Sequence, residues 1–153
     1  MQTRVTQILD DAGIEYQLKP HSRPVFTTQE AAQERGVPES QIVKTMIVET
    51  AAGDTLVALI PGDRKLDWAG LRRASGQRRL TLVPRERIPD LTGYPTGAIS
   101  PVGLPDGFTI YADNAFLEEM MVSTSSGLPE AGLLLRREDL FRLLQATIAQ
   151  IAK

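Results

Sequence analysis

One lysine stands inside a run of residues that otherwise has the composition of a buried β-strand. The segment 42–48 is apolar or β-branched except for Lys44, which is typical of a strand with little solvent on either face. A lysine is almost never fully buried without a partner, so its ammonium must reach an edge, pair with a carboxylate or point into a polar cavity. The segment predicts a strand, and it leaves open whether Lys44 lies at an edge in water or in a polar site.

The composition limits the chemistry that the chain can perform. Its 153 residues, 42% of them hydrophobic, fit one domain over residues 1–153. There are no cysteines and a single histidine, His21, so we expect no disulfide, no thiolate nucleophile, no metal site and no cofactor. No leader pattern opens the chain and no apolar run approaches membrane-spanning length. We therefore expect a soluble, cytoplasmic protein without a membrane partner.

Helices and short strands follow one another without a regular alternation. Apolar spacing predicts helices over residues 3–12, 27–35, 66–74 and 137–151, with shorter helical turns over 84–88 and 114–119. Short apolar runs predict strands over residues 14–18, 42–48, 55–61, 79–83, 108–112, 120–125 and 133–135. This order favours an α+β domain with a mixed, largely antiparallel sheet.

The segment 91–105 holds glycines and prolines too densely for a helix or a central strand. Glycine lets a ligand approach bare backbone, whereas proline holds a loop in one conformation. The segment is therefore suited to a rigid wall lined with backbone N–H groups. Ordinary surface turns require the same residues, so this alternative stays open.

Positive charge is concentrated in one part of an acidic chain. Between Asp63 and Arg87 there are eight cations and three acids, a local excess of five, although the net charge of the whole chain is −2. A basic patch on an acidic protein can bind a phosphate backbone, and a solvated helix face gives the same pattern. The candidate phosphate-binding residues are Arg72, Arg73, Arg78 and Arg79.

Several short motifs occur in the order and spacing of a known family. These are Glu30-Ala31-Ala32 before Gly36-Val37-Pro38, Val43-Lys44-Thr45, Gly93-Tyr94, Gly97-Ala98-Ile99-Ser100-Pro101, and Ser125-Ser126-Gly127 before Glu138-Asp139-Leu140. Over nearly its whole length the chain resembles the YbaK/ProX-type editing domains. These are aminoacyl-tRNA deacylases that also occur as the insertion domain of bacterial prolyl-tRNA synthetases. The resemblance implies a barrel-like sheet flanked by helices.

The resemblance implies hydrolysis of the ester that joins a wrong amino acid to the 3′-terminal adenosine of tRNA, with the essential lysine at Lys44. Ester hydrolysis develops negative charge on the carbonyl oxygen, which an ammonium and fixed backbone N–H groups can stabilise. Gly97 is the expected source of those N–H groups. Lys44 could instead bind a phosphate near the tRNA terminus and only position the ester.

Further site residues follow from the same resemblance. Substrate binding is expected of Thr45, Ala98, Ile99, Ser100, Pro101, Ser125, Gly127 and His21. A threonine at position 45 favours the cysteine-editing branch, in which the thiol of the substrate attacks its own ester. In the alanine-editing branch a positioned water must serve. The turn over residues 128–131 departs from the more basic, glycine-containing stretch of the family.

The sequence therefore predicts a freestanding trans-editing deacylase of mischarged tRNA. The expected substrate is Cys-tRNA(Pro) or Ala-tRNA(Pro), and prolyl-tRNA synthetase is a candidate partner. The alternative is a non-catalytic module that binds aminoacyl ends or docks on a synthetase. Lys44 together with the loop 97–101 favours the enzyme, because a docking module would need neither.

Overall fold

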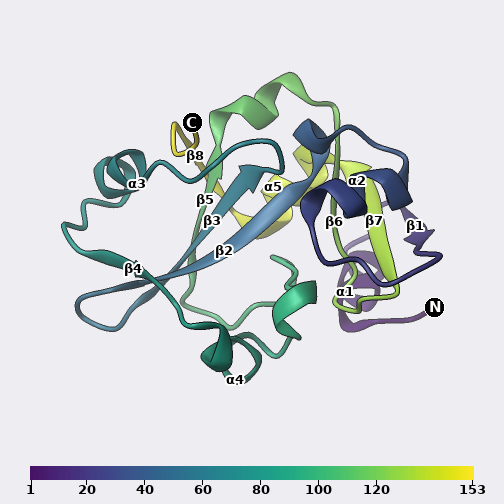
Figure 1. Ribbon diagram of the computed structural model, residues 1–153, viewed down its shortest axis with the longest axis horizontal. Coiled ribbons are helices and arrows are strands. Elements are labelled where there is room, and N and C mark those ends of the chain that lie inside the picture. Colours follow the sequence, from purple (N-terminus) through teal and green to yellow (C-terminus); the bar gives the residue numbers. More distant parts are fainter.

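The computed structural model describes all 153 residues, which form two β-sheets and five α-helices (Figure 1). The first sheet has the strand order β1-β7-β6, formed by Tyr16–Pro20, Ala131–Arg136 and Met121–Ser125. The second has the order β4-β2-β3-β5-β8, formed by Leu80–Leu82, Val43–Thr50, Thr55–Pro61, Thr109–Asp113 and Thr147–Ala149. The helices are α1 Arg4–Asp11, α2 Thr28–Arg35, α3 Trp68–Ser75, α4 Ile88–Thr92 and α5 Arg137–Leu144. Four 3-10 helices complete the chain: η1 Glu39–Gln41, η2 Arg85–Arg87, η3 Thr96–Ala98 and η4 Asn114–Glu118.

The strand pairing confirms the predicted α+β class. All pairs of the first sheet are antiparallel, and in the second β2 is antiparallel to β3 and β4 while β5 is parallel to β3 and β8. The barrel-like closure that the resemblance implied is not formed, because both strand orders are open. An isolated bridge between Ile42, just before β2, and Ser123 of the edge strand β6 joins the two sheets. This bridge brings the start of β2 beside β6.

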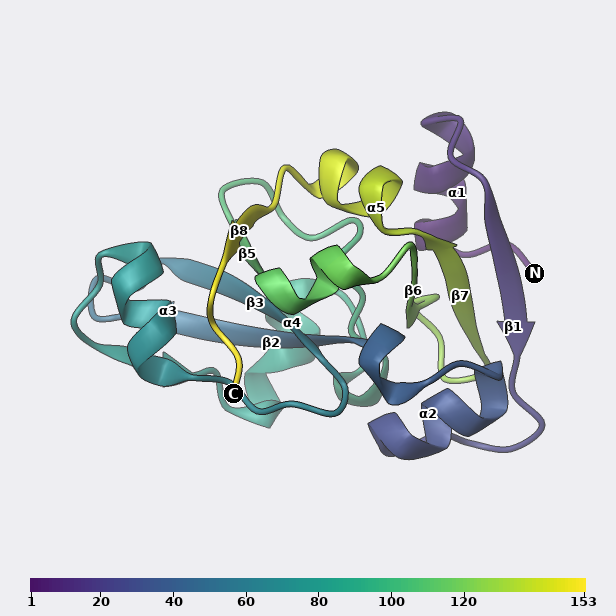
Figure 2. The same ribbon diagram turned by 90° about the horizontal axis from the view of Figure 1, so that it is seen from above.

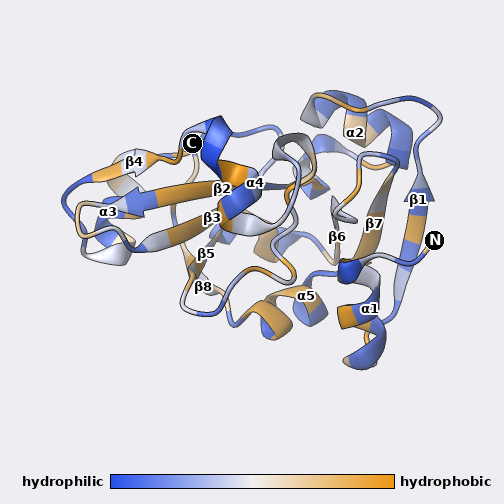
Figure 3. Ribbon diagram, turned by 90° about the horizontal axis from the view of Figure 1, so that it is seen from below, coloured by the Kyte–Doolittle hydropathy of each residue, from blue (hydrophilic) through white to orange (hydrophobic).

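Successive side chains of strand β2 pack into two different apolar cores. Val43 and Ile47 belong to the larger core, whereas Val48 belongs to a second core on the other face of the sheet. Strands β2, β3 and β7 are accordingly among the most apolar ribbons of the molecule (Figure 3). Because successive side chains point to opposite faces of a strand, Thr45 shares the face of Val43 and Ile47, and Lys44 takes the other face.

Helix α2 begins and ends where the sequence predicts. The side chain of Thr27 accepts a hydrogen bond from the Glu30 N–H, which satisfies one of the free donors at the start of the helix. Gly36 ends the helix with φ 69°, a left-handed conformation that glycine adopts at low cost. Helix α2 lies at the end of the molecule where β2 begins, and α3 lies at the opposite end (Figures 1 and 2).

The prediction of one helix over residues 137–151 is wrong. Helix α5 ends at Leu144, and residues 147–149 form β8, which pairs with β5. The carboxylate of Asp113 accepts hydrogen bonds from the N–H groups of Ile151 and Ala152, both at 2.9 Å. These tertiary bonds hold the segment in extended form against the sheet. None of the helices combines the length and the apolar character that crossing a bilayer requires.

Candidate active site

A cavity of about 260 Å³ lies between α2, the start of β2, the segment around η3, and β6. Of the residues predicted for the site, four line it: Lys44, Gly97, Ile99 and Ser125. Four other hollows, of about 650, 560, 350 and 320 Å³, are larger, and of the predicted residues only Pro101 lines one of them. The lysine of β2 and the glycine-proline segment, which are distant in sequence, are therefore brought to the same cavity.

Lys44 is a half-buried cation that keeps free donors. Its Nζ donates to the carbonyl oxygen of Arg64 at 2.9 Å, and it takes part in none of the ion pairs of the chain. An ammonium has three N–H donors, so this contact leaves capacity for a ligand. Burial lowers the pKa of Lys44 and nearby Lys65 lowers it further, whereas Asp63 and Glu39 raise it. Lys44 is thus a partly desolvated cation facing a cavity.

Most of the remaining cavity lining consists of apolar side chains and hydroxyl groups. The apolar side chains are Val25, Ala31, Ile42, Val43 and Ile99, and the hydroxyls are Thr27, Thr28, Thr96 and Ser125. Neither cysteine nor histidine lines the cavity, nor does any carboxylate. Each of the four hydroxyls donates a hydrogen bond to a neighbouring oxygen, and no histidine or carboxylate in the lining could activate one of them as a nucleophile. The nucleophile is therefore expected from the substrate or from solvent.

Ser125 ties the glycine-proline segment to β6. Its Oγ donates to the carbonyl oxygen of Ala98 at 3.0 Å and accepts from the N–H of Gly127 at the same distance. Gly127 has φ 91°, and a Cβ there would come within 2.9 Å of the Tyr94 ring. Ala98 and Gly127 therefore support the cavity wall from behind. The N–H of Ala98 is also occupied, since it donates to Pro95.

Four other residues predicted to bind substrate do not line the cavity. Thr45 lies on the opposite face of β2, where its hydroxyl is buried without a hydrogen-bond partner. Ser100 is fully buried and accepts from the Val102 N–H. Pro101 lines a separate cavity beside the end of α5. The ring of His21 contacts the carbonyl of Pro129 at 2.7 Å and Arg35 Nε at 3.2 Å.

Three of the cavity residues that the sequence reasoning did not identify are charged or aromatic. Arg35 is only 9% exposed, and Phe26, in contrast, is 82% exposed. Arg85 is the third and is also exposed. Arg35 follows Ala31 by four positions and so shares its face of α2, which the structure buries. Nothing in the sequence around Phe26 distinguished it.

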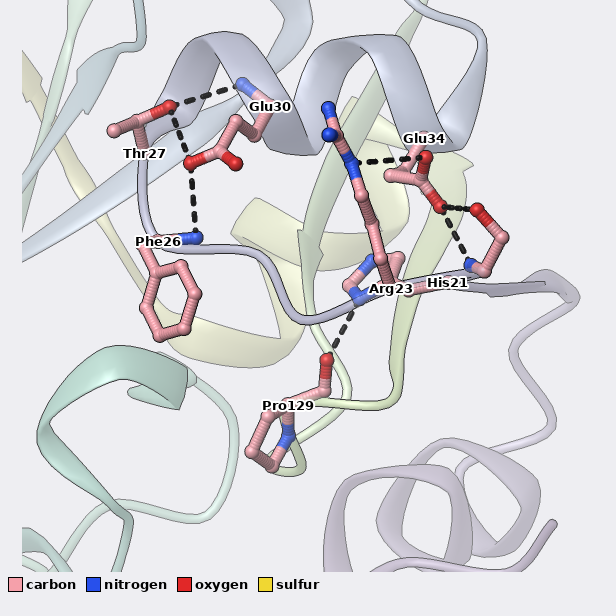
Figure 4. Close-up of polar contacts among 8 residues, drawn as sticks. His21, Arg23, Phe26, Thr27, Glu30, Glu34 and Pro129 are labelled. Atoms are coloured by element: carbon pink, nitrogen blue, oxygen red, sulfur yellow. Dashed lines mark hydrogen bonds and ion pairs between the residues drawn. The ribbon is translucent and has the colours of Figure 1, made fainter.

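The segment that carries Phe26 is fixed by hydrogen bonds to α2 and to the turn before β7 (Figure 4). Glu34 accepts from the N–H and the hydroxyl of Ser22, at 2.6 and 2.8 Å. Glu30 accepts from the Phe26 N–H at 3.3 Å, and His21 contacts the turn at Pro129. The two bonds from Ser22 are the main reason that the pKa of Glu34 is lowered. The cavity entrance is therefore held in place by several independent contacts.

The predicted phosphate-binding arginines lie apart from the cavity. Arg72 and Arg73 are exposed on α3, and Arg78 and Arg79 are exposed before β4. Strand β4 pairs with the last residues of β2, so Arg79 lies about 20 Å along the strand direction from Lys44. The exposure of these four arginines is compatible with phosphate binding and equally with a surface that contacts only solvent.

A cavity that combines a desolvated lysine, exposed glycine backbone and no protein nucleophile is typical of an ester-hydrolysing site that relies on electrostatic stabilisation. Residues 22–143 match the aminoacyl-tRNA editing domain. The chain belongs to this family. Membership of an editing family supports the deacylase activity that the sequence predicted.

Relatives of known sequence and structure agree with this assignment. The chain is 26% identical over 126 residues to the "Putative Cys-tRNA(Pro)/Cys-tRNA(Cys) deacylase EbsC" of Enterococcus faecalis, covering 82% of this chain and 77% of that protein. It is 34% identical over 93 residues to the proline–tRNA ligase of Maridesulfovibrio salexigens, covering 61% of this chain but only 16% of the ligase. The crystal structure of "a putative trans-editing enzyme for prolyl tRNA synthetase" superposes with a TM-score of 0.85 at 28% identity, covering 98% of this chain and 95% of that one.

Proposed function

We propose that this chain removes a small wrong amino acid, cysteine or alanine, from mischarged tRNA(Pro), acting in trans in the cytoplasm. The observation that carries the proposal is the convergence of Lys44 and Gly97 on one cavity. The names of the deacylase relative and of the trans-editing structure support tRNA(Pro) as the substrate. The ligase relatives support prolyl-tRNA synthetase as a partner that delivers the tRNA.

In the proposed reaction a nucleophile adds to the carbonyl carbon of the aminoacyl ester. The carbonyl oxygen becomes negative, and the bond from the carbonyl carbon to the ribose oxygen of the terminal adenosine then breaks. The leaving oxygen takes a proton and remains on the tRNA as a hydroxyl. Lys44 stabilises the oxyanion, or it holds the neighbouring phosphate and positions the ester. For alanine the nucleophile is water, whereas cysteine can use its own thiol.

Residues at the cavity entrance have the chemistry needed to hold the terminal adenosine. The exposed ring of Phe26 offers a surface on which the adenine can stack. Arg85 offers a guanidinium for a phosphate, and such pairs are often bidentate. The cations of α3 and of the segment before β4 would then contact the acceptor stem beyond the cavity.

The test is the release of labelled amino acid from Cys-, Ala- and Pro-tRNA(Pro). We expect release of cysteine, alanine or both well above the rate in buffer, and no release of proline. A protein that releases neither cysteine nor alanine would overturn the proposal. Adding prolyl-tRNA synthetase to the same assay measures whether delivery increases the rate.

A further inference from the structure

Arg35 is a buried cation without an acidic partner. Its side chain comes from the last turn of α2 and is 9% exposed. It takes part in none of the ion pairs, and its two hydrogen-bond acceptors are Nε2 of His21 at 3.2 Å and Oγ of Ser123 at 3.3 Å. Both acceptors are neutral groups when His21 carries its proton on Nδ1, facing Pro129. A guanidinium has five N–H donors, so most of its donor capacity is unused.

The first sheet contains a space made for this side chain. Gly132 in β7 stands opposite Arg35, and a Cβ built on Gly132 would overlap the Nε, Cζ and Cδ atoms of the arginine. Burial lowers the pKa of Arg35 to about 10, so the group is still charged at neutral pH. A buried charge is costly unless something compensates it. The compensating group is therefore expected from a ligand in the cavity that Arg35 lines.

Three cations that differ in their exposure to solvent line the cavity. Arg85 is exposed, Lys44 is half-buried and Arg35 is buried. An aminoacyl-tRNA end has three matching parts, namely the terminal phosphate, the ester and the amino-acid side chain. A phosphodiester continues into the nucleic acid on both sides and needs an open surface, so it suits Arg85 and not Arg35. The free tip of the amino-acid side chain is the part that can reach a buried guanidinium.

We propose that Arg35 is a specificity-determining residue that donates hydrogen bonds to an oxygen or sulfur on the side chain of the wrong amino acid. This inference rests on the proposed function and narrows it. It predicts preference for cysteine and serine, which carry an acceptor atom, over alanine, which carries none. Cysteine is favoured further because its thiol can ionise and then compensates the guanidinium charge fully.

The first experiment measures kcat/KM of the parent protein on Cys-, Ser- and Ala-tRNA(Pro). We expect cysteine and serine to exceed alanine by about tenfold to a hundredfold, the range of one hydrogen bond to a charged group. A parent that prefers alanine overturns the role of Arg35 but leaves the deacylase function standing. A parent that releases none of the three overturns the proposed function itself.

The second experiment replaces the guanidinium. In Arg35→Leu the ratio of cysteine to alanine kcat/KM should fall about tenfold or more, whatever the change in the absolute rates. A purely structural role would lower kcat/KM for all substrates equally, so an unchanged ratio overturns the inference.

Gly132→Ala provides an independent variant, because it displaces the guanidinium without removing it and should lower the same ratio of cysteine to alanine kcat/KM. In the double variant no guanidinium is left to displace, so Gly132→Ala should have little further effect on the ratio there. Thermal unfolding of each variant shows which ones are folded.

Discussion

The hydroxyl of Ser125 donates to the carbonyl of Ala98 at 3.0 Å, and this bond joins strand β6 to the segment that carries Gly97. The position of the glycine backbone in the cavity is therefore set by a residue of the sheet and does not depend on the glycine itself. A Cβ built on Gly97 would meet no atom within 4 Å, because the space beside it is the cavity. Position 97 can thus be changed to test function with little effect on the fold.

We expect Gly97→Val to slow deacylation strongly while the unfolding temperature stays close to that of the parent. The added side chain would occupy the space that the ester needs, and it would block approach to the backbone. Steady-state rates and thermal unfolding measure the two effects separately. Pro101→Ala is the control in the same segment, since Pro101 faces another cavity and should slow turnover less. Parent-like rates in Gly97→Val would mean that the segment is an ordinary turn.

Lys44→Ala should abolish deacylation and leave the fold intact. The lysine makes one hydrogen bond, to a carbonyl in an exposed segment, and removing it leaves no buried charge unpaired. Single-turnover release of the amino acid and a circular dichroism spectrum are the two measurements. A rate within about threefold of the parent, a loss of less than about 1 kcal/mol of transition-state stabilisation, would be incompatible with either role given to Lys44.

The pH dependence should report the ionisation of Lys44. Burial is the largest influence on this group and lowers its pKa, so its ammonium loses its proton at a lower pH than a free lysine. The ammonium is the form that stabilises an oxyanion, and therefore the enzymatic rate should decrease as the pH rises through that lowered pKa. The measurement is the rate on an aminoacyl-adenosine after subtraction of the alkaline background hydrolysis. Any activity that remains in Lys44→Arg should not show this decrease, because arginine stays charged.

The exposed arginines of α3 and the segment before β4 are expected to bind the tRNA stem. Reversal of Arg72, Arg73, Arg78 and Arg79 to glutamate should weaken tRNA binding and flatten its salt dependence. Each lost phosphate contact removes roughly 0.7 to 0.9 from the slope of log K against log salt. Hydrolysis of an aminoacyl-adenosine should survive, because the cavity lies about 20 Å away along β2.

A control with the same change of charge at another place distinguishes the effect of the arginine's position from the effect of the protein's net charge. Arg72→Glu alone should change the salt slope, whereas Arg136→Glu, at an exposed position of β7 outside the basic segment, should not. Equal slopes for the parent and the quadruple variant would show that these arginines only solvate the surface.

The sequence predicted those parts of the site that depend on local chemistry. A lysine in an apolar strand and a dense set of glycines and prolines are unusual in themselves, and one residue of each, Lys44 and Gly97, lines the cavity. Thr45 was expected to bind substrate, but side chains alternate along a strand, so the structure places it on the face opposite Lys44. The alternation rule agrees with the buried position of the Thr45 hydroxyl.

The parts that were missed depend on contacts between distant segments. Residues 147–151 have apolar spacing that suits a helix, but Asp113 binds the backbone of Ile151 in extended form. Arg35 reads as a surface charge at the end of a helix until Gly132, far along the chain, provides space for it. Phe26 is exposed at the cavity only because the preceding segment is bound to Glu34 and to the turn at Pro129.

The bound segment at the cavity entrance has a consequence for how the protein would choose its substrates. Its contacts with Glu34, Glu30 and Pro129 form when the chain folds, so little conformational entropy remains to be lost when a ligand arrives (Figure 4). An entrance fixed in this way keeps the same conformation for different ligands. It would hold the terminal adenosine, which wrongly and correctly charged tRNA share, in one position, so the choice between amino acids would be left to the cavity behind it.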